Sequence, residues 1–463
     1  MAFYKYSRRW ILLQRYCKIS MVVTVLLCLV LGCALIKRYK IPSLIKPTSS
    51  VLLTTEIIRA IHVNDNEIIS ARDMFSDSEL HVKLLRQKVE RLARKVKKSR
   101  SIILNSKTMF PPNYNVHVFY YAWYANKQVD GYYRHWNHSY LPNWKKDGQK
   151  LYPTGSHEPA LDIGSNFYPA LGCYSSKDPQ VINTHMKQLK EAGIGVIVVS
   201  WTPPKFNDSP NEVLPLLFRY AELHKIKIAL HIEPYIERNP INLFEYLREF
   251  FKEYKNHPAL YKMKKPLGDK EVPVVYVYDS YLTPAIAWKE LLSTKGNLSV
   301  RGSDVDAIFI GLLVDIQHRY HIKKSHFDGF YTYFAANSFS YGSTWKNWKS
   351  LAKFAVQNGL IFIPSVGPGY IDTQVRPWNA RNTRHRRNGQ YYDVAWRTAI
   401  SSNTNYISIT SFNEWHEGTQ IEPAVPKIIP NFTYLDYEPG DPQFYLNLTK
   451  WWIGQFNKSL AKN

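Results

Sequence analysis

Residues 194–235 read IGVIVVSWTPPKFNDSPNEVLPLLFRYAELHKIKIALHIEPY. Two almost unbroken apolar runs, 194–201 and 226–235, enclose an amphipathic segment at 211–225. Strands buried on both faces have such continuous hydrophobicity, and two parallel strands need a long crossover between them, usually a helix. The stretch therefore predicts a strand, a helix and a second strand parallel to the first.

The same alternation extends on both sides of this stretch, from Asn115 to the C-terminus. Apolar runs rich in β-branched and aromatic residues recur at 116–124, 272–280, 307–314, 327–334, 360–370 and 406–415. Amphipathic segments lie between them, at 179–192, 241–256, 284–294, 344–358, 391–401 and 441–460. Eight strands that alternate with helices over roughly 350 residues predict an α/β protein, a closed (β/α)₈ TIM barrel in one catalytic domain, 111–463. A doubly wound open sheet is the alternative, but no glycine-rich phosphate motif follows an early strand.

The N-terminal region contains a hydrophobic segment. Residues 19–36, ISMVVTVLLCLVLGCALI, carry no charge and have Lys or Arg on both sides. A helix of that length spans about 27 Å, enough for a thin bilayer such as that of the endoplasmic reticulum or Golgi. We expect a transmembrane signal-anchor at 19–36 with a cytoplasmic tail at 1–18, although a cleaved signal peptide would share this pattern.

Residues 37–110 read as a stem that contains a basic helix. Apolar residues recur there at spacings of three and four, the seam of a short coiled coil: Val82, Leu85, Val89, Leu92 and Val96. Two heptads are few for a stable coiled coil, so a spacer helix is favoured over self-association through this stem. Residues 1–110 hold 21 Lys and Arg against 7 Asp and Glu, which is more than half of the net charge of +23. The body carries no recognisable nucleic-acid module, so no nucleic-acid partner is expected.

Cysteines and glycosylation motifs bear on the compartment. Cys173 is the only cysteine of the body, so no intrachain disulfide is expected there. Six Asn-x-Ser/Thr triplets begin at Asn137, Asn207, Asn297, Asn431, Asn447 and Asn457. These triplets favour a lumenal body in the secretory pathway, and the short anchor favours a single-pass type II membrane protein of the endoplasmic reticulum or Golgi.

Functional residues of a barrel collect where its strands end, because the loops there converge over the mouth. Aromatic side chains and carboxylates alternate at these ends, together with a long aromatic insert, 125–178, after the first strand. Ring faces stack on sugars and carboxylates bind hydroxyls in pairs, so the composition is typical of a carbohydrate site. For any one aromatic residue, core packing is the alternative. The candidates are Tyr121, Trp123, Tyr124, Trp201, His231, Glu233, Tyr235, Tyr278, Asp279, Tyr331, Tyr333, Arg376, Trp378, Asn413, Trp415 and His416.

Glu414 and Glu417 are the candidate catalytic pair at the end of the eighth strand. If the chain turns helically there, residues three apart lie about 5–6 Å from each other, and retaining glycosidases place their carboxyl groups about 5–5.5 Å apart. If the strand continued, the odd spacing would put them on opposite faces. Glu422 is interpreted as a structural or rim residue. No tight zinc pattern accompanies the histidines, so neither a metal nor a cofactor is expected.

Several long motifs resemble glycoside hydrolase family 99 over about 115–450. They are VFYYAWY, HWNH, DIGSNFYPALG, HIEPY, VYDSY, FDGFYTYFA, IFIPSVGPGYIDT with RPWN, and ITSFNEWHEGTQIE. The resemblance implies a retaining enzyme that cleaves an internal α-1,2-mannosidic bond in N-glycans through a 1,2-anhydro sugar. It implies that Glu414 deprotonates the sugar 2-hydroxyl and that Glu417 is the general acid and base. A non-catalytic, lectin-like barrel is the alternative.

The resemblance also implies roles for the surrounding residues. His231, Glu233, Tyr121, Tyr333, Arg376 and Asn413 would line the sugar subsites. Thr202 departs from the animal enzymes of the family, which carry an aromatic residue there. Because threonine has no ring for stacking, the preference for glucosylated or plain mannose chains stays open.

Overall fold

The computed structural model describes residues 110–143, 151–206, 208–265 and 270–461. Within these ranges no helix has both the length and the apolar character needed to cross a membrane. The predicted tail, the anchor and all of the stem except Phe110 lie outside the described residues, as does the glycosylation motif residue Asn207.

The strand, helix and strand predicted from residues 194–235 are confirmed. β3 (Ile194–Trp201) is buried along its whole length, α6 (Leu214–His224) crosses over it, and β4 (Lys227–Ile232) returns parallel to β3. The pairing runs from Val196 opposite Lys227 to Trp201 opposite Ile232. The unbroken hydrophobicity of β3 thus reflects neighbours on both of its faces.

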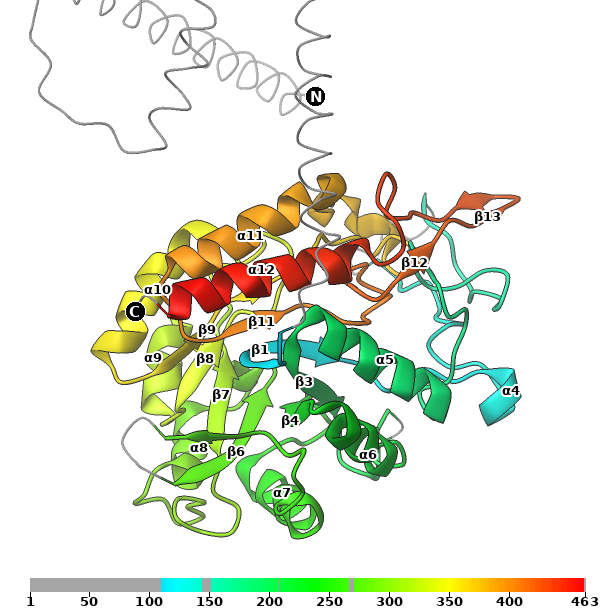
Figure 1. Ribbon diagram of the computed structural model, residues 1–463. Helices are drawn as coiled ribbons and strands as arrows, with labels where there is room; N and C mark the ends of the chain where they lie inside the picture. Colours follow the sequence, from blue (N-terminus) through cyan, green and yellow to red (C-terminus); the bar gives the residue numbers. More distant parts are fainter. Residues whose placement is uncertain (1–109, 144–150, 207, 266–269, 462–463) are drawn as a thin grey trace, which may run out of the picture. The chain divides into compact units, whose positions relative to one another are not determined.

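Nine parallel strands of the described residues form a nearly closed barrel, in the order β10-β11-β1-β3-β4-β6-β7-β8-β9 (Figure 1). β9 and β10 are separated by Pro364 alone, which has no N–H to donate to a ladder. Taken as one interrupted strand, they leave the eight strand positions of a TIM barrel, and β11 joins β10 to β1. The other strands are β1 (Asn113–Tyr120), β6 (Glu271–Val277), β7 (Ile308–Leu312), β8 (Gly329–Tyr331), β9 (Ile361–Ile363), β10 (Ser365–Val366) and β11 (Ile407–Ile409).

Helices cover the outside of the barrel, as the amphipathic segments predict (Figure 1). The side chain of Asp178 caps the first turn of α5, and Gly193 ends this helix at φ +81°, a conformation that favours glycine. α9 (His318–Lys324) was not predicted, because its sequence is polar and buries only Ile322. The remaining helices are α5 (Pro179–Ala192), α7 (Pro240–Tyr254), α8 (Ala285–Leu292), α10 (Trp348–Gln357), α11 (Gln390–Ser401) and α12 (Phe444–Leu460).

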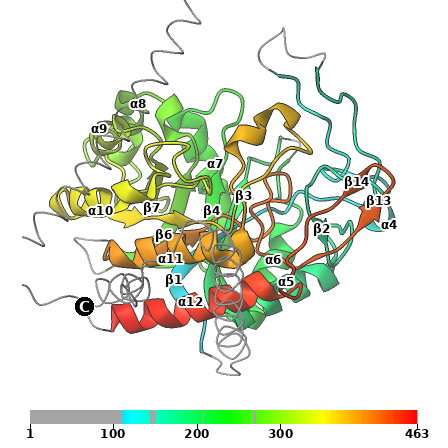
Figure 2. The same ribbon diagram turned by 90° about the horizontal axis from the view of Figure 1, so that it is seen from above.

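The insert after β1 lies beside the segment that follows β11 (Figure 2). β2 (Tyr168–Pro169) of the insert pairs antiparallel with β12 (Ala424–Val425). Cys173 of the insert is a free cysteine. Further short elements are α4 (Lys127–Asp130), β5 (Lys262–Lys264), β13 (Ile428–Ile429), β14 (Phe432–Thr433) and the 3₁₀ turns Ser280–Leu282, Trp345–Asn347, Pro377–Asn382 and Arg387–Gly389.

Candidate active site

The chain turns as soon as β11 ends. The amide of Glu414 donates to Ser411 Oγ at 2.8 Å, and the amide of Gly418 donates to the carbonyl of Trp415 at 3.2 Å. These short-range bonds take the place of strand pairing, so the alternative of a continued strand is wrong. We call residues 411–418 the acidic turn, since it carries both Glu414 and Glu417.

Glu414 is the more deeply placed of the two carboxylates, with 4% of its surface exposed. Its Oε1 accepts a hydrogen bond from the backbone N–H of His416 at 3.1 Å. Burial, together with the negative charge of Glu417, raises the pKa of Glu414 well above its ordinary value, while the His416 amide opposes the shift. The two carboxyl groups therefore interact electrostatically.

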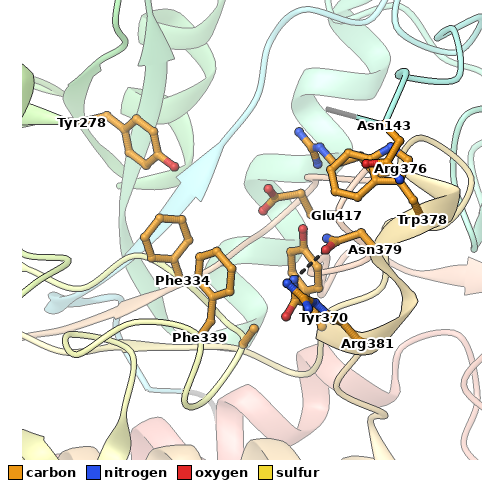
Figure 3. Close-up of a pocket in the computed structure, with 12 residues that line it drawn as sticks. Asn143, Tyr278, Phe334, Phe339, Tyr370, Arg376, Trp378, Asn379, Arg381 and Glu417 are labelled. Carbon is orange, nitrogen blue, oxygen red and sulfur yellow. Dashed lines mark hydrogen bonds between the residues drawn. The ribbon is translucent and has the colours of Figure 1, made fainter. Parts of the chain in front are cut away.

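Glu417 lies on the wall of a cavity of about 500 Å³ at the barrel mouth (Figure 3). Burial raises the pKa of Glu417 to about 7 against the opposing charge of Arg376, and Asp372 and Glu233 add to the rise. The other lining residues are Asn143, Tyr278, Phe334, Ala336, Phe339, Tyr370, Arg376, Trp378, Asn379, Arg381 and Asn382.

Buried Asp372 organises one wall of this cavity. It accepts hydrogen bonds from Tyr370 Oη at 2.8 Å and Asn379 Nδ2 at 2.9 Å, and pairs with Arg376 at 3.2 Å. Burial alone would lower the pKa of Arg376, but the negative charges around it, that of Glu417 foremost, raise this pKa overall. The guanidinium is therefore fixed as a cation beside Glu417. Trp378, also predicted, donates from Nε1 to the carbonyl of Leu141 at 3.0 Å.

A second polar group lies at the ends of β4 and β8. His231 contacts Tyr331 Oη at 2.6 Å through Nε2 and Glu233 Oε1 at 3.1 Å through Nδ1. Ser200 Oγ donates to the same Glu233 oxygen at 2.8 Å. The side chain of Glu233 is 20% exposed. The ring of His231 stacks on that of Tyr333, with centroids 5.7 Å apart.

Two predicted residues tie the acidic turn to β1. The amide side chain of Asn413 accepts from the backbone N–H of Tyr121 and donates to its carbonyl, both at 2.8 Å. The phenol of Tyr121 is hydrogen-bonded to that of Tyr333, and Glu414 and Glu417 both act on the pKa of these phenols, which burial raises. Tyr121 and Tyr333 are thus neighbours of the carboxylate pair.

Several aromatic candidates pack inside the protein and do not line this cavity. Trp201 contacts Phe250 of α7, and Tyr235 donates to Asn242 at the start of the same helix. Tyr124 and Tyr331 are buried, with their hydroxyls engaged by Asn413 and His231. Burial follows from side-chain direction at each strand end, which the sequence pattern does not resolve.

Trp415 and Glu422 belong to a buried network beneath the acidic turn. Trp415 Nε1 donates to Glu422 Oε2 at 2.9 Å, and Glu422 Oε1 lies 3.1 Å from His185 Nε2. Tyr174 Oη donates to Glu422 at 2.8 Å. Glu422 is therefore structural, as interpreted from the sequence, whereas Trp415 supports the turn and does not line the cavity.

The insert contacts the acidic turn through histidines and Trp123. His416 Nδ1 lies 2.7 Å from the carbonyl oxygen of Gly164, so this nitrogen carries the proton. The half-buried ring of Trp123 stacks on His135 with centroids 4.3 Å apart. No group of three potential ligands with metal-binding geometry occurs in residues 110–143, 151–206, 208–265 and 270–461.

Sequence reasoning missed most of the cavity wall. Phe334, Phe339, Tyr370, Asn379 and Arg381 lie in the segments that follow β8 and β10, beyond the strand ends where site residues were expected. The motif RPWN pointed to Asn379, which follows Arg376 and Trp378 within it. Phe339 and Arg381 carried no comparable signal.

Comparison with known proteins assigns the chain to a family. The sequence profile of Glycosyl hydrolase family 99 matches residues 111–458. The chain belongs to glycoside hydrolase family 99. As a member of this family it is a glycoside hydrolase, and the barrel described here is its hydrolase domain.

Relatives in family 99 are similar over most of the chain. A rat glycoprotein endo-alpha-1,2-mannosidase is 50% identical over 363 residues, 78% of each chain. A human glycoprotein endo-alpha-1,2-mannosidase-like protein is 48% identical over 348 residues, 74% of this chain and 76% of the relative. The solved family 99 endo-alpha-mannosidase of Bacteroides thetaiotaomicron has a TM-score of 0.71 and 42% identity, covering 76% of this chain and 99% of its own.

Proposed function

We propose that this hydrolase cleaves an internal α-1,2-mannosidic bond in N-glycans with retention of anomeric configuration. One observation carries the proposal: the acidic turn presents Glu417 to a sugar-sized cavity and keeps the carboxyl group of Glu414 as its electrostatic neighbour. The names of the similar rat and bacterial enzymes support an α-mannoside as substrate. Membership of a hydrolase family disfavours the lectin-like alternative.

The two carboxylates take different roles. Glu414 removes the proton from the 2-hydroxyl, and this oxygen attacks the anomeric carbon as the glycosidic C–O bond breaks. Glu417 donates its proton to the departing oxygen, which leaves as an alcohol. Water then opens the 1,2-anhydro sugar at the anomeric carbon, giving its proton to Glu417 while the 2-oxygen recovers one from Glu414. Two inversions at one carbon give net retention.

The protonation state of the two carboxyl groups fits these roles at neutral pH. Burial favours the neutral form of both groups, and mutual repulsion disfavours two charges, so the pair holds at least one proton. Without substrate the larger upward pKa shift is that of Glu414, whereas the assignment requires the proton on Glu417 once substrate binds. The His416 amide already stabilises a charged Glu414, and a 2-hydroxyl donating to the same carboxylate would stabilise it further.

Neighbouring side chains support the sugar that is cut. Tyr121 and Tyr333 lie beside both carboxylates, and Glu233 is held by His231 and Ser200 with part of its side chain exposed. A fixed carboxylate of this kind accepts hydrogen bonds from sugar hydroxyls. Arg376, a cation beside Glu417, would stabilise negative charge on the departing oxygen.

The proposed place of action is the Golgi lumen, with the body held by the anchor at 19–36. The six glycosylation motifs and the apolar segment of the sequence support this location. Microscopy of the tagged full chain, with protease protection of the body in sealed vesicles, tests it. A body that is digested without detergent would overturn the assignment.

Product analysis on defined N-glycans tests the activity. The wild-type chain should release a short mannose-terminated oligosaccharide whose new reducing end is first formed as the α-anomer. Glycans with and without terminal glucose compare the two substrate classes that Thr202 leaves open. Glu417→Gln should lose hydrolysis while still binding glycan, because the amide cannot donate a carboxyl proton. Glycan binding without turnover by the wild-type chain would favour a lectin.

A further inference from the structure

Of the two carboxylates, Glu417 lines the cavity and Glu414 does not. The other walls come from the loops after β6, β8 and β10, together with Asn143 of the insert. His231 and Glu233, at the end of β4, are not part of its lining. On the proposed function, on which this inference rests, Glu417 protonates the departing oxygen. The sugar attached to that oxygen therefore enters this cavity.

One wall of the cavity is aromatic (Figure 3). Phe334 and Phe339 meet edge to face, with ring centroids 5.1 Å apart, and Tyr278 lies on the same side. Phe339 is 49% exposed, which is unusual for a phenylalanine in a folded protein. Apolar surface left open on a cavity wall is a common mark of a ligand site.

The turn that carries Phe339 is fixed despite this exposure. The backbone N–H of Asn337 donates to Tyr391 Oη at 2.7 Å, and its carbonyl accepts from Arg384 Nε at 3.0 Å. The side chain of Asn337 accepts from the amide of Trp345 at 3.1 Å. The amide of Phe339 itself donates to the carbonyl of Ala336 at 3.1 Å. The exposed ring is thus preorganised, so a ligand that covers it orders little of the chain.

The opposite wall combines polar side chains with the ring of Trp378. Arg376, Asn379 and Arg381 belong to one short segment around the 3₁₀ turn Pro377–Asn382, across the cavity from the two phenylalanines (Figure 3). Asn382 of the same segment also lines the cavity. A pyranose has one apolar face of C–H groups and a rim of hydroxyls. A slot with rings on one side and guanidinium and amide groups on the other is complementary to such a shape.

We propose that Phe339, supported by Phe334, is the stacking platform for the sugar on the leaving-group side of the scissile bond. The platform determines specificity for the glycan chain that remains after cleavage. A hexose ring lies with its C–H face on Phe339 while its hydroxyls bind the segment 376–382. The sugars transferred to water contact the Glu233 side and do not use the platform.

Two substrates that differ only in the leaving group test this assignment. One is an α-1,2-linked mannose oligosaccharide, and the other is the fluoride of the same glycone, whose leaving group is a single atom. For Phe339→Ala we expect kcat/KM to fall about five- to tenfold on the oligosaccharide and to stay within about twofold on the fluoride. Phe339→Trp keeps a ring and should retain the oligosaccharide activity.

Tyr320→Ala is the matched control, because Tyr320 is a 60% exposed ring on α9 outside the cavity lining. It should leave both substrates unchanged. Equal loss of Phe339→Ala activity on both substrates, or no loss on the oligosaccharide, would overturn the platform. If Phe339→Ala does not fold, Phe339→Leu, which keeps an apolar side chain without a ring, decides on the same two criteria. A wild-type chain that hydrolyses neither substrate would instead refute the proposed function.

Discussion

The backbone N–H of His416 donates a 3.1 Å hydrogen bond to Oε1 of Glu414, the carboxylate two residues before it in the same turn. The turn therefore stabilises the charge of its own acidic residue, although burial opposes that charge. Glu417, the residue after His416, has no such amide donor among the described residues. Its ionised form is favoured by the positive charge of Arg376. This asymmetry supports different roles for two identical side chains.

The first prediction concerns the pH dependence of hydrolysis. The reaction needs one carboxyl of the pair ionised and the other protonated. The pKa values of both are raised, that of Glu417 to about 7, so protonation of the base inactivates the enzyme well above the ordinary carboxyl range. We expect a bell-shaped kcat/KM profile with its maximum near neutral pH. A maximum near pH 4.5 would contradict the described environment of the pair.

The second prediction concerns stability. A carboxyl whose pKa is higher in the folded than in the unfolded state stabilises the fold at low pH, and this contribution is lost as the pH rises through about 7. Glu417→Gln removes the ionisation. Because Glu417 is partly exposed, we expect a gain on the order of 1–2 kcal/mol at pH 8 and almost none at pH 4.5. Urea unfolding at both pH values measures the difference, and an equal effect at both would contradict it.

Arg386 supplies a third prediction, as a positioning residue behind the acidic turn. Its Nη2 donates to the carbonyls of Gly418 at 2.9 Å and Gln420 at 2.8 Å, and its guanidinium lies within 4.5 Å of the ring centroids of Phe167 and Tyr445. Lysine cannot reproduce this planar contact. Arg386→Lys should lower kcat about tenfold, roughly 1.4 kcal/mol, and shift the pH profile with little change in KM.

The neighbouring arginine is the matched control for this experiment. Arg387 is exposed, so Arg387→Lys should leave kcat and the pH profile unchanged. If Arg386→Lys lowered the melting temperature but kept the wild-type kcat and pH profile, Arg386 would be structural only.

The fourth prediction tests the buried network under the turn. His185 and Glu422 are both fully buried and lie 3.1 Å apart. Glu422→Ala leaves His185 Nε2, Tyr174 and Trp415 without their shared buried partner, so it should cost about 3–5 kcal/mol of unfolding free energy. The exposed pair of Lys177 and Glu212, at 2.6 Å, is the control, and Glu212→Ala should hardly change the urea midpoint. Similar effects of the two substitutions would contradict a stabilising role of the buried network.

Much of the fold was predictable because its buried strands have long, continuous apolar runs. β3 coincides with the predicted run at 194–201, and α5 with the segment at 179–192, since both have long, uniform burial patterns. α9 was missed because a seven-residue helix with a single buried isoleucine has no periodic signal. The interruption at Pro364 was hidden in a run that reads as one strand.

The site was predictable in its acidic turn and less so in its walls. Glu417, Arg376 and Trp378 line the cavity as expected, because long motifs mark them. Trp201 and Tyr235 contact residues of α7, and the sequence does not say whether a residue at a strand end points to the mouth or to the outer helices. Phe339 depends on a loop conformation fixed by distant partners such as Tyr391 and Arg384, which no local pattern encodes.

The pairing of β1 with β11 joins segments that lie near the two ends of the barrel sequence. At the site, Asn413 joins the same two segments, because its side chain is hydrogen-bonded to the backbone of Tyr121. During synthesis β1 can pair with β3 early, but its other edge stays unpaired until β11 has been made. A nascent chain released before Ile407 would lack the acidic turn as well as the final seam of the barrel. The enzyme can therefore become active only when translation of the domain is almost complete. Chains truncated before the acidic turn are expected to be inactive.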